Sequence, residues 1–545
     1  MPSYNKKEIL VAEKQDQELP KYSRRQQGEV KEVEKQATHT STDSQTYKID
    51  LDGSHRFYIL ILSLIMALSS VANPLLTNFA NPTQMVHLYT GQMMSQGHLP
   101  YLNTFATGGF LFYVIIAFSY FLGSSFWLMI IEFLAFYMSG IYFYKIISFL
   151  TEKKGLGITF TVIFYLLNIA LGFGGLYPIQ WAYPFILNAL WFLTKYFAGH
   201  INDEAFIIYG FFGTLAALID PRSLIFWVLS FIIIGIYNLL QRHIARGIYQ
   251  LLCMIFGAIL VYYTVGYFVL NMGNLPAYIS QALFYNFKVF ALAKDSLLIT
   301  LPYQILVLSA SGLLLGLFGF FGHLGRVLQF KTVKWLVFFN LIITLLVGIF
   351  SQTYYVFSLL LALPFGLILT ALVISDTINE QAGQETKSTR GAHRRKRNRE
   401  LAGSYWSIFA KRHFQLPILV MVAGILAPIL LGVLSLGMNR ERSAISRYLQ
   451  ENSSSKTSIY VWDQSPKIYL DSGLQSISQF PNPTVNTVGS DNSQKRNDDI
   501  LQAQAKFIVV DKSQELPKEI SRLLKSSYKQ VSLENADHFK IYQKK

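Results

Sequence analysis

Long apolar runs, separated by short polar segments, fill the chain from residue 57 to residue 437. Most runs hold roughly 15–25 residues, close to the ~20 that an α-helix needs to cross about 30 Å of hydrocarbon. The pattern predicts an all-α polytopic membrane domain over residues 56–438, with about 11–13 transmembrane helices. The predicted spans are 57–76, 106–122, 126–149, 156–173, 177–196, 205–219, 223–240, 248–271, 299–321, 335–350, 354–374 and 416–437.

Polar segments flank this domain on both sides. Residues 1–55 are rich in Lys, Gln, Glu, Ser and Thr, so they carry too little apolar surface to fold, and a disordered cytoplasmic tail is predicted. In residues 439–545, "TSIYVWD", "AKFIVVD" and "FKIYQKK" have the β-branched and aromatic residues of strands. "SQELPKEISRLLKSSYKQ" has the period of an amphipathic helix. These segments predict a small extracytoplasmic α/β domain.

The scarcity of acidic residues supports a bilayer as the solvent. Hydrophobic residues make up 52% of the chain, and a water-facing surface of this length would need far more charge than the sequence holds. The acids between Arg56 and Ser375 are Glu132, Glu152, Asp203, Glu204, Asp220 and Asp295.

The net charge of +15 reflects membrane topology rather than nucleic-acid binding. Basic residues gather in loops, most densely in the predicted cytoplasmic loop 376–415, where contact with anionic lipid is also expected. The positive-inside rule places the N-terminus inside a cell membrane and the C-terminal domain outside. One conflict remains: Lys153 and Lys154 should share the inner face with the tail, but three predicted spans separate them.

Cofactor chemistry has no sequence signal. The one cysteine, Cys253, lies in an apolar run and excludes a disulfide within the chain. Paired metal-ligand spacing and glycine-rich phosphate loops are absent from the sequence, so neither a metal nor a cofactor is predicted.

The loop 77–105 between the first two predicted spans is the first candidate site. Met85, Leu88, Tyr89, Gln92 and Met93 fall at helical spacing, which predicts a helix lying along the interface. "GHLPY" should end that helix, because it contains a glycine and a proline. The loop carries histidines, tyrosines and amide side chains but no carboxylate.

This loop resembles the first extracytoplasmic loop of the GT-C superfamily of membrane glycosyltransferases, which includes the protein O-mannosyltransferases and the lipid A aminoarabinose transferase. The resemblance rests on a helix, then "G..PY", a polar residue two positions on, and a glycine-rich entry to the next span. "YVWDQSPKIYLDSGLQSISQF", 460–480, resembles the outer α/β domain at the C-terminus of bacterial members. The resemblance implies a GT-C-like fold, a polyprenyl-phosphate-linked sugar as donor, and bacterial cell-envelope biosynthesis proteins as partners.

The catalytic positions that this resemblance implies are substituted. The family's acid corresponds to Thr83 or Gln84, and a second family acid corresponds to Asn103. An amide can hydrogen-bond a sugar but cannot act as a base at neutral pH. The candidates for substrate binding are therefore Gln84, His87, His98, Tyr101 and Asn103, although interfacial hydrogen bonding is the favoured explanation of the two histidines.

Asp220 in "LIDPRS" is the best replacement acid. It is predicted at the outer end of a span, and Arg222 follows two residues later, where it could meet a lipid phosphate. The alternative is a helix-end ion pair at a tight proline turn. Asp295 and the intramembrane Glu132 are weaker candidates.

Three functions stay open on the sequence. The first is a glycosyltransferase with a relocated acid. The second is a catalytically inactive relative that binds lipid-linked glycan or serves as an accessory protein, which the carboxylate-free loop favours. The third is a transporter, based on the intramembrane residues Asn168, Asn188 and Gln304.

Overall fold

The computed structural model describes residues 50–199, 201–287, 294–323, 331–350, 356–385, 405–454, 457–487, 490–503, 505–534 and 536–545. All contacts below lie within Leu51–Lys545. The predicted tail 1–55 lies outside the described residues up to residue 49, and so do residues 386–404 of the predicted loop 376–415.

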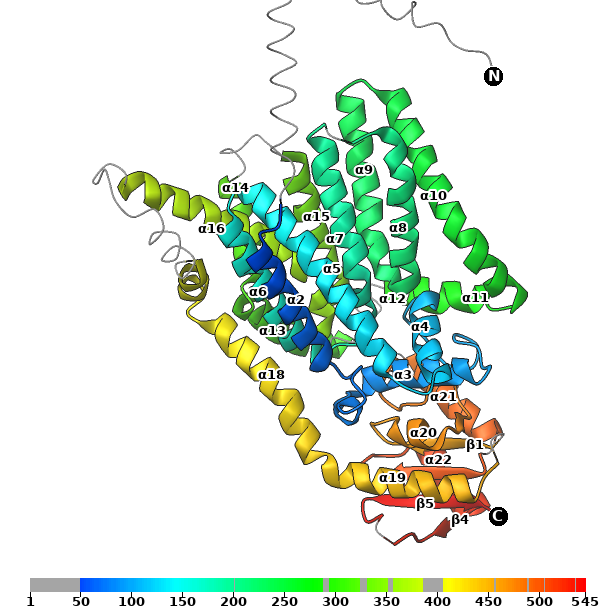
Figure 1. The fold of residues 1–545 in the computed structure, drawn as a ribbon. Helices are drawn as coiled ribbons and strands as arrows, with labels where there is room; N and C mark the ends of the chain where they lie inside the picture. The colour runs from blue at the N-terminus through cyan, green and yellow to red at the C-terminus, as the bar shows by residue number, and fades with distance from the viewer. Residues whose placement is uncertain are drawn as a thin grey trace, which may run out of the picture. The chain divides into compact units, whose positions relative to one another are not determined.

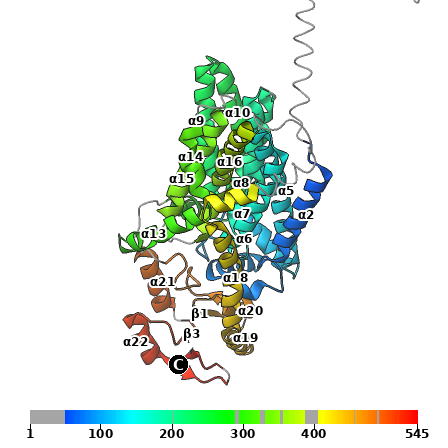
Figure 2. The same cartoon turned by 90° about the vertical axis from the view of Figure 1, so that its left-hand side faces the viewer.

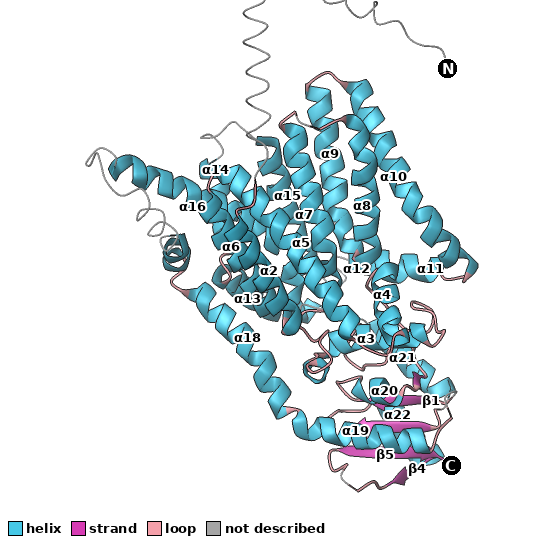
Figure 3. Ribbon diagram, in the orientation of Figure 1, coloured by secondary structure: helices cyan, strands magenta, loops and turns pink. Residues whose placement is uncertain are grey.

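The membrane domain is helical, as predicted, and the strands lie in the C-terminal part of the chain (Figures 1 and 3). Its α-helices are α2 (Gly53–Leu68), α3 (Pro82–Ser95), α4 (Phe110–Phe121), α5 (Phe126–Thr151), α6 (Lys154–Gly172), α7 (Pro178–Phe197), α8 (Phe206–Ile219), α9 (Leu224–Leu240), α10 (Ile244–Asn271), α11 (Leu275–Tyr278), α12 (Tyr285–Phe287), α13 (Lys294–Ala310), α14 (Leu313–His323), α15 (Lys331–Ile349), α16 (Leu363–Glu385) and α18 (Leu416–Leu434). Short 3-10 or π-helical turns are η1 (Thr77–Phe79), η2 (Asp203–Ala205), η3 (Pro221–Ser223), η4 (Ile279–Phe284) and η5 (Val356–Leu361).

Helix α2 packs on α5 and α6, and contacts of the residues at the two ends of α2 and α6 identify the two ends of the bundle. At one end the Lys154 ammonium lies 2.7 Å from the Asp52 carboxylate. At the other, the backbone N–H of Val71 donates to the carbonyl of Gly174 at 2.7 Å. We call the Val71 end, against which the C-terminal domain packs, the domain end, and the Asp52 end the far end.

The short helix α4 bears on the conflict in the predicted topology. With 12 residues it is about 18 Å long, too short for about 30 Å of hydrocarbon, and it packs along α3 at the domain end. A path with α2 and α5 as the two crossings before Lys153 and Lys154 fits the Asp52–Lys154 ion pair, which holds the start of α2 beside the start of α6. Of the span predicted at 106–122, the helical part is Phe110–Phe121, a shorter apolar helix than the six that are long enough to cross.

Among the described residues, six helices are long and apolar enough to cross a membrane, and a bent pair makes a seventh if counted as one span. That count is below the predicted 11–13, because α2, α4 and the apolar part of α16 are shorter and because α7 and α8 do not meet the same test of length and apolar character. The bent pair corresponds to the span predicted at 299–321. It breaks by 82° between Ala310 and Leu313, where Gly312 has φ +79°, a conformation that favours glycine.

The C-terminal domain contains a five-stranded sheet in the order β2-β1-β3-β5-β4. Its strands are β1 (Ser458–Trp462), β2 (Gln475–Ser476), β3 (Phe507–Asp511), β4 (Tyr528–Val531) and β5 (Phe539–Lys544), and its helices are α19 (Leu436–Glu451), α20 (Lys467–Ser472), α21 (Ser490–Ala503) and α22 (Lys518–Ser527). Strand β1 pairs parallel with β2 and β3, whereas β5 runs antiparallel to β3 and β4. The predicted small α/β domain is confirmed. The helix predicted over 513–530 is shorter, Lys518–Ser527: it begins after Pro517 and ends three residues earlier than predicted, because Tyr528 begins β4.

Both faces of this sheet are covered. One face buries Ile459 and Val461 against Ile445 and Leu449 of α19. The opposite face buries Tyr460 and Ile508 against α22. The long helix α18 leads from the membrane domain to α19, and the sheet lies below the helices in both views (Figures 1 and 2).

Candidate functional site

Helix α3 is fixed at its start by a reciprocal cap. The Asn81 side chain accepts the backbone N–H of Gln84 at 3.0 Å, and the Gln84 side chain accepts that of Asn81 at 2.8 Å. The Gln84 amide also donates to the carbonyl of Gly175 at 2.7 Å and to that of Phe173 at 3.2 Å. Its fully buried side chain therefore joins α3 to the turn between α6 and α7.

The rest of the loop is bonded to the membrane domain. Tyr101, at φ 70°, donates its hydroxyl to the carbonyl of Gly108 at 2.8 Å, and its own carbonyl accepts from Gln281 at 2.7 Å. Asn103 accepts the backbone N–H of Leu99 at 2.8 Å, which closes a local turn. His98 is partly exposed in that turn. These contacts fix residues 77–105 to the membrane domain. We call this segment the roof, because it covers the domain end of the bundle.

The C-terminal domain packs on the other side of this roof. The Tyr89 hydroxyl accepts the backbone N–H of Ser476 at 2.7 Å, and the Phe105 N–H donates to the carbonyl of Gln479 at 2.8 Å. The rings of Phe105 and Phe480 stack with centroids 5.0 Å apart. The predicted interfacial helix α3 is thus buried on both sides, by the bundle and by the sheet domain.

Two adjoining cavities lie under the roof. The small cavity, of about 110 Å³, brings together α3, η3, α12, α15, η5 and the loop before α21. The large cavity, of about 560 Å³, extends between α18, η1 and the C-terminal domain. Thr83, Phe357 and Val485 line both, so the two spaces share a wall.

Among the described residues that line the small cavity, Arg222 is the one with a charged side chain. Its Nε donates to Asp220 Oδ1 at 3.0 Å, and its Nη2 donates to Asp220 Oδ2 at 2.7 Å. The Asp220 carboxylate is 1% exposed and also accepts the backbone N–H of Arg222, at 3.0 Å. The ion pair uses both carboxylate oxygens but leaves Nη1 of the guanidinium available to a cavity ligand.

His87 also lines the small cavity. Its Nδ1 is 3.2 Å from the Tyr113 hydroxyl. Burial, followed by the positive charge of Arg222, lowers the pKa of His87 to about 3, so the ring is neutral near pH 7. It can donate or accept a hydrogen bond there, but it is a weak base.

The structure brings together some of the predicted site residues and not others. His87, Arg222 and Thr83 line the small cavity, and Asp220 lies directly behind Arg222. The side chains of Gln84, Tyr101 and Asn103 hold the roof in place. Asp295 has no described side chain.

Sequence reasoning missed several cavity residues because they come from segments that are distant along the chain. Asn286 of α12 donates to the Thr107 carbonyl at 2.7 Å and forms part of the wall. Phe357 of η5 and Val485 of the C-terminal domain complete the shared wall. The proline- and asparagine-rich "PNPTVN" is the only local sign of a shaped loop at Val485.

Family models place the chain among known sequences. The model "Putative competence-induced protein Ccs4 N-terminal domain" matches residues 44–436, and the corresponding C-terminal domain model matches residues 439–545. The chain belongs to the Ccs4 family. A search of curated proteins found no match to this Ccs4-family chain.

Among solved structures, the Ccs4-family chain is similar to the archaeal oligosaccharyltransferase AglB from Archaeoglobus fulgidus, which was solved with an inhibitory peptide and a dolichol-phosphate. The similarity has a TM-score of 0.44 and 12% sequence identity, and it covers 84% of this chain and 69% of AglB.

Within the described residues, no group of three or more His, Cys, Asp or Glu side chains is arranged to hold a metal ion.

Proposed function

We propose that this protein binds a polyprenyl-phosphate-linked sugar at the domain end of its membrane domain, as a non-catalytic component of cell-envelope glycan assembly. The large cavity takes the isoprenoid chain, and the small cavity takes the phosphate beside Arg222. In this proposal the domain end faces the outside of a bacterial cytoplasmic membrane, and the tail lies in the cytoplasm.

The walls of the large cavity suit an isoprenoid. They include Phe79, Phe173, Tyr303 and Leu431, and a volume of about 560 Å³ lies within the ~300–1,000 Å³ that is usual for small-molecule sites. Most of α18 is exposed along its apolar length, so a lipid can reach this cavity from the bilayer.

The small cavity suits a phosphate. Its volume of about 110 Å³ corresponds to about three or four waters at ~30 Å³ each. The Arg222 guanidinium is held in place by Asp220 and supplies a cation with a fixed direction. Thr83 and Asn286 add polar side chains on the wall that could bond phosphate or sugar oxygens.

The observation that carries the non-catalytic role is the absence of an acid from these walls. Among the described residues that line the two cavities, none is Asp or Glu. Removing a proton from an acceptor requires a base near the reacting atom, and His87 is a weak one. The site is therefore better equipped to hold a phosphosugar than to transfer it.

A second candidate is glycosyl transfer with Asp220 as the relocated acid. Its carboxylate lies directly behind the cavity wall, bonded to a side chain that lines the cavity. To act as a base it must first release Arg222, for example when a ligand phosphate takes over that guanidinium. This candidate predicts turnover that is lost in Asp220→Asn.

The test uses purified full-length protein in nanodiscs and a polyprenyl-phosphate-linked hexose, with the matching polyprenol as a phosphate-free probe. We expect the phosphosugar to bind more tightly than the polyprenol. The Asp220→Asn/Arg222→Gln double variant should lose about tenfold or more in affinity for the phosphosugar alone, the usual loss for one charge-assisted hydrogen bond. Using the double variant avoids leaving a buried unpaired charge.

A glycine pair provides the matched control for the large cavity. A Cβ on Gly432 would lie 1.7 Å from the Phe79 ring, whereas one on Gly437 would meet nothing within 4 Å. Gly432→Leu should therefore weaken both probes, and Gly437→Leu should weaken neither. Equal binding of both probes to every variant contradicts the proposed site, and sugar transfer that Asp220→Asn abolishes selects the second candidate.

A further inference from the structure

A third cavity, of about 370 Å³, lies on α19 away from the bundle interior. We call it the basic recess. Its charged lining residues are Arg440, Arg447 and Lys467, and no acidic side chain belongs to the described lining. It shares Asn78 and Asn439 with the large cavity, so it lies at the edge of that space.

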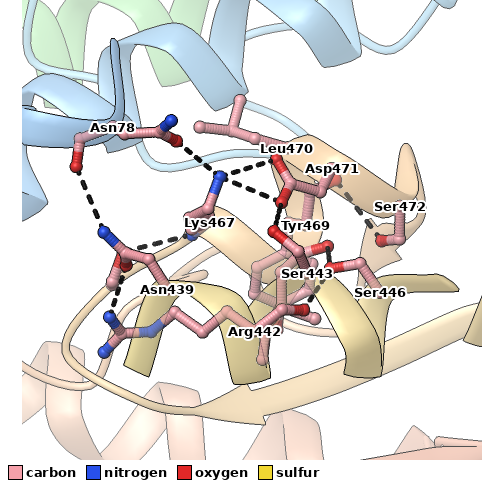
Figure 4. A network of polar contacts seen from close by, with 12 residues as sticks. Asn78, Asn439, Arg442, Ser443, Ser446, Lys467, Tyr469, Leu470, Asp471 and Ser472 are labelled. Carbon is pink, nitrogen blue, oxygen red and sulfur yellow. Dashed lines mark hydrogen bonds and ion pairs between the residues drawn. The ribbon is translucent and has the colours of Figure 1, made fainter. Parts of the chain in front are cut away.

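The recess has a fixed inner wall. Lys467 is 11% exposed, and its Nζ lies 2.7 Å from Asn78 Oδ1 and 3.0 Å from an Asp471 oxygen (Figure 4). The Asn439 amide donates to the Asn78 carbonyl at 3.3 Å and accepts from Arg442 at 2.8 Å. The η1 turn, which contains Asn78, is thus joined to α19 and α20 behind the recess. Asp471 balances the charge of Lys467.

The outer wall carries two arginines without a balancing acid. Arg440 and Arg447 are exposed, and neither forms an ion pair with another described residue. They are seven residues apart on α19, which is about two helical turns, so both project from the same side of the helix. Two guanidinium groups at one opening favour a ligand with negative charge.

The distance of the recess from the end of the apolar helix α18 indicates a membrane lipid as its ligand. The apolar helix α18 ends at Leu434, and Arg440 follows six residues later, at most about 9 Å further along at ~1.5 Å per residue. The headgroup layer on each side of the hydrocarbon is roughly 5–8 Å thick. Leu436, 45% exposed, lies at the edge of the recess and can contact the acyl region.

We propose that the basic recess binds the phosphate of an anionic membrane lipid, whose headgroup lies between Arg440 and Arg447. This site is separate from the phosphate position beside Arg222 and does not depend on what the large cavity holds. A lipid held there fixes the junction of α18 and α19 at the membrane surface.

The experiment measures lipid retention on detergent-purified full-length protein by native mass spectrometry, with phosphatidylglycerol and phosphatidylcholine as probes. We expect phosphatidylglycerol to be retained in preference. Arg440→Gln/Arg447→Gln should reduce that preference about 30-fold, which corresponds to ~2 kcal/mol for two basic side chains. Arg522→Gln, an exposed arginine on α22 at the other face of the sheet, is the matched control and should leave the preference unchanged.

A third arm separates the two sources of phosphate. Inorganic phosphate should not displace the lipid at a concentration equal to that of the lipid, because it lacks acyl chains to contact Leu436 and α18. Displacement under those conditions assigns the recess to a soluble phosphate and overturns the proposal. The proposal is also overturned if the double arginine variant keeps the preference, or if the unmodified protein shows none.

Discussion

Arg222 and Asp220 form a two-bond ion pair in which Nε–Oδ1 is 3.0 Å and Nη2–Oδ2 is 2.7 Å. The arginine side chain is 21% exposed, on the side of the small cavity, and the aspartate is 1% exposed behind it. The charge that a ligand meets is therefore positive, while the negative charge is covered. A site that exposes a cationic side chain and buries its carboxylate partner is suited to holding an anion.

Removing one partner of this pair should be more damaging than removing both. Asp220→Ala leaves a partly buried guanidinium without its counter-charge, which costs up to the ~3–5 kcal/mol typical of a fully buried pair, whereas apolar replacement of both partners is often close to neutral. We expect Asp220→Ala to lower the thermal unfolding temperature in detergent strongly, and Asp220→Ala/Arg222→Met to recover most of the loss. Losses that simply add in the double variant would contradict a coupled pair.

Restoring an acid at the two positions implied by the GT-C resemblance should have opposite effects. Thr83 lines both cavities in the first turn of α3, where a carboxylate typically gains about 0.3–1 kcal/mol from the helix N-terminus. Gln84 instead donates to the carbonyls of Gly175 and Phe173. Gln84→Glu replaces that donor with an acceptor and should cost about 1–3 kcal/mol.

Thermal unfolding of Thr83→Asp and Gln84→Glu in the same detergent measures this contrast, with Thr83→Asn as the uncharged control. Offering the polyprenyl-phosphate-linked hexose to Thr83→Asp then asks whether an acid on the cavity wall is enough for sugar transfer. A stable Gln84→Glu variant would show that the amide is not needed to hold α3 to the bundle.

Local patterns in the sequence were sufficient for the helical membrane domain and for most of the sheet domain. Apolar length predicts spans such as α5 and α10, and β-branched runs predict β1, β3 and β5, because each pattern is contained within one element. The helix in the 106–122 run begins only at Phe110, because the start of the run, "ATGG", is not helical. Gly109 lies against the α8 backbone, where a Cβ would be 2.1 Å from the carbonyl oxygen of Leu218.

The site was less predictable because it is assembled across long sequence separations. "NPTQ", 81–84, also has the spacing of a helix cap, and the structure uses it as one. The pairing of Arg222 with Asp220 is local and could be anticipated as a helix-end ion pair. Nothing local places Phe357 and Val485 on the same wall as Thr83, since that wall exists only after the C-terminal domain packs on α3.

His538 should make the attachment of β5 to α19 depend on pH. Its Nδ1 lies 2.6 Å from Glu441 Oε1, and its backbone N–H donates to the other oxygen at 2.9 Å. The Glu441 carboxylate raises the pKa of His538 above its usual 6.5, so the stabilisation is fully present below pH 6.5 and is lost as the pH rises through the higher folded value.

Hydrogen exchange of the 536–545 peptide in the full-length protein measures this effect. We expect the protein to show greater protection than His538→Gln at pH 6 and a smaller difference at pH 9, after correction for the intrinsic exchange rate. A difference that stays constant between those pH values would assign the contact to the backbone hydrogen bond alone.

The far-end contacts predict which side of the membrane each loop occupies. Asp52 pairs with Lys154 at 2.7 Å, and Asp203, after α7, pairs with Arg246, after α9, at 2.9 Å. The buried Cys253 can be replaced by alanine to give a background without cysteine, in which the exposed Ser54, Gln241 and Gln96 are each changed to cysteine.

A membrane-impermeant maleimide should label Gln96→Cys in intact cells, because that residue lies in the roof at the domain end. Ser54→Cys and Gln241→Cys should react only after permeabilisation, and they should do so together, because both lie at the far end. Labelling of Ser54→Cys and Gln241→Cys from opposite sides would contradict an even number of crossings between them. Labelling of both in intact cells would be consistent with an even number of crossings but would reverse the proposed orientation.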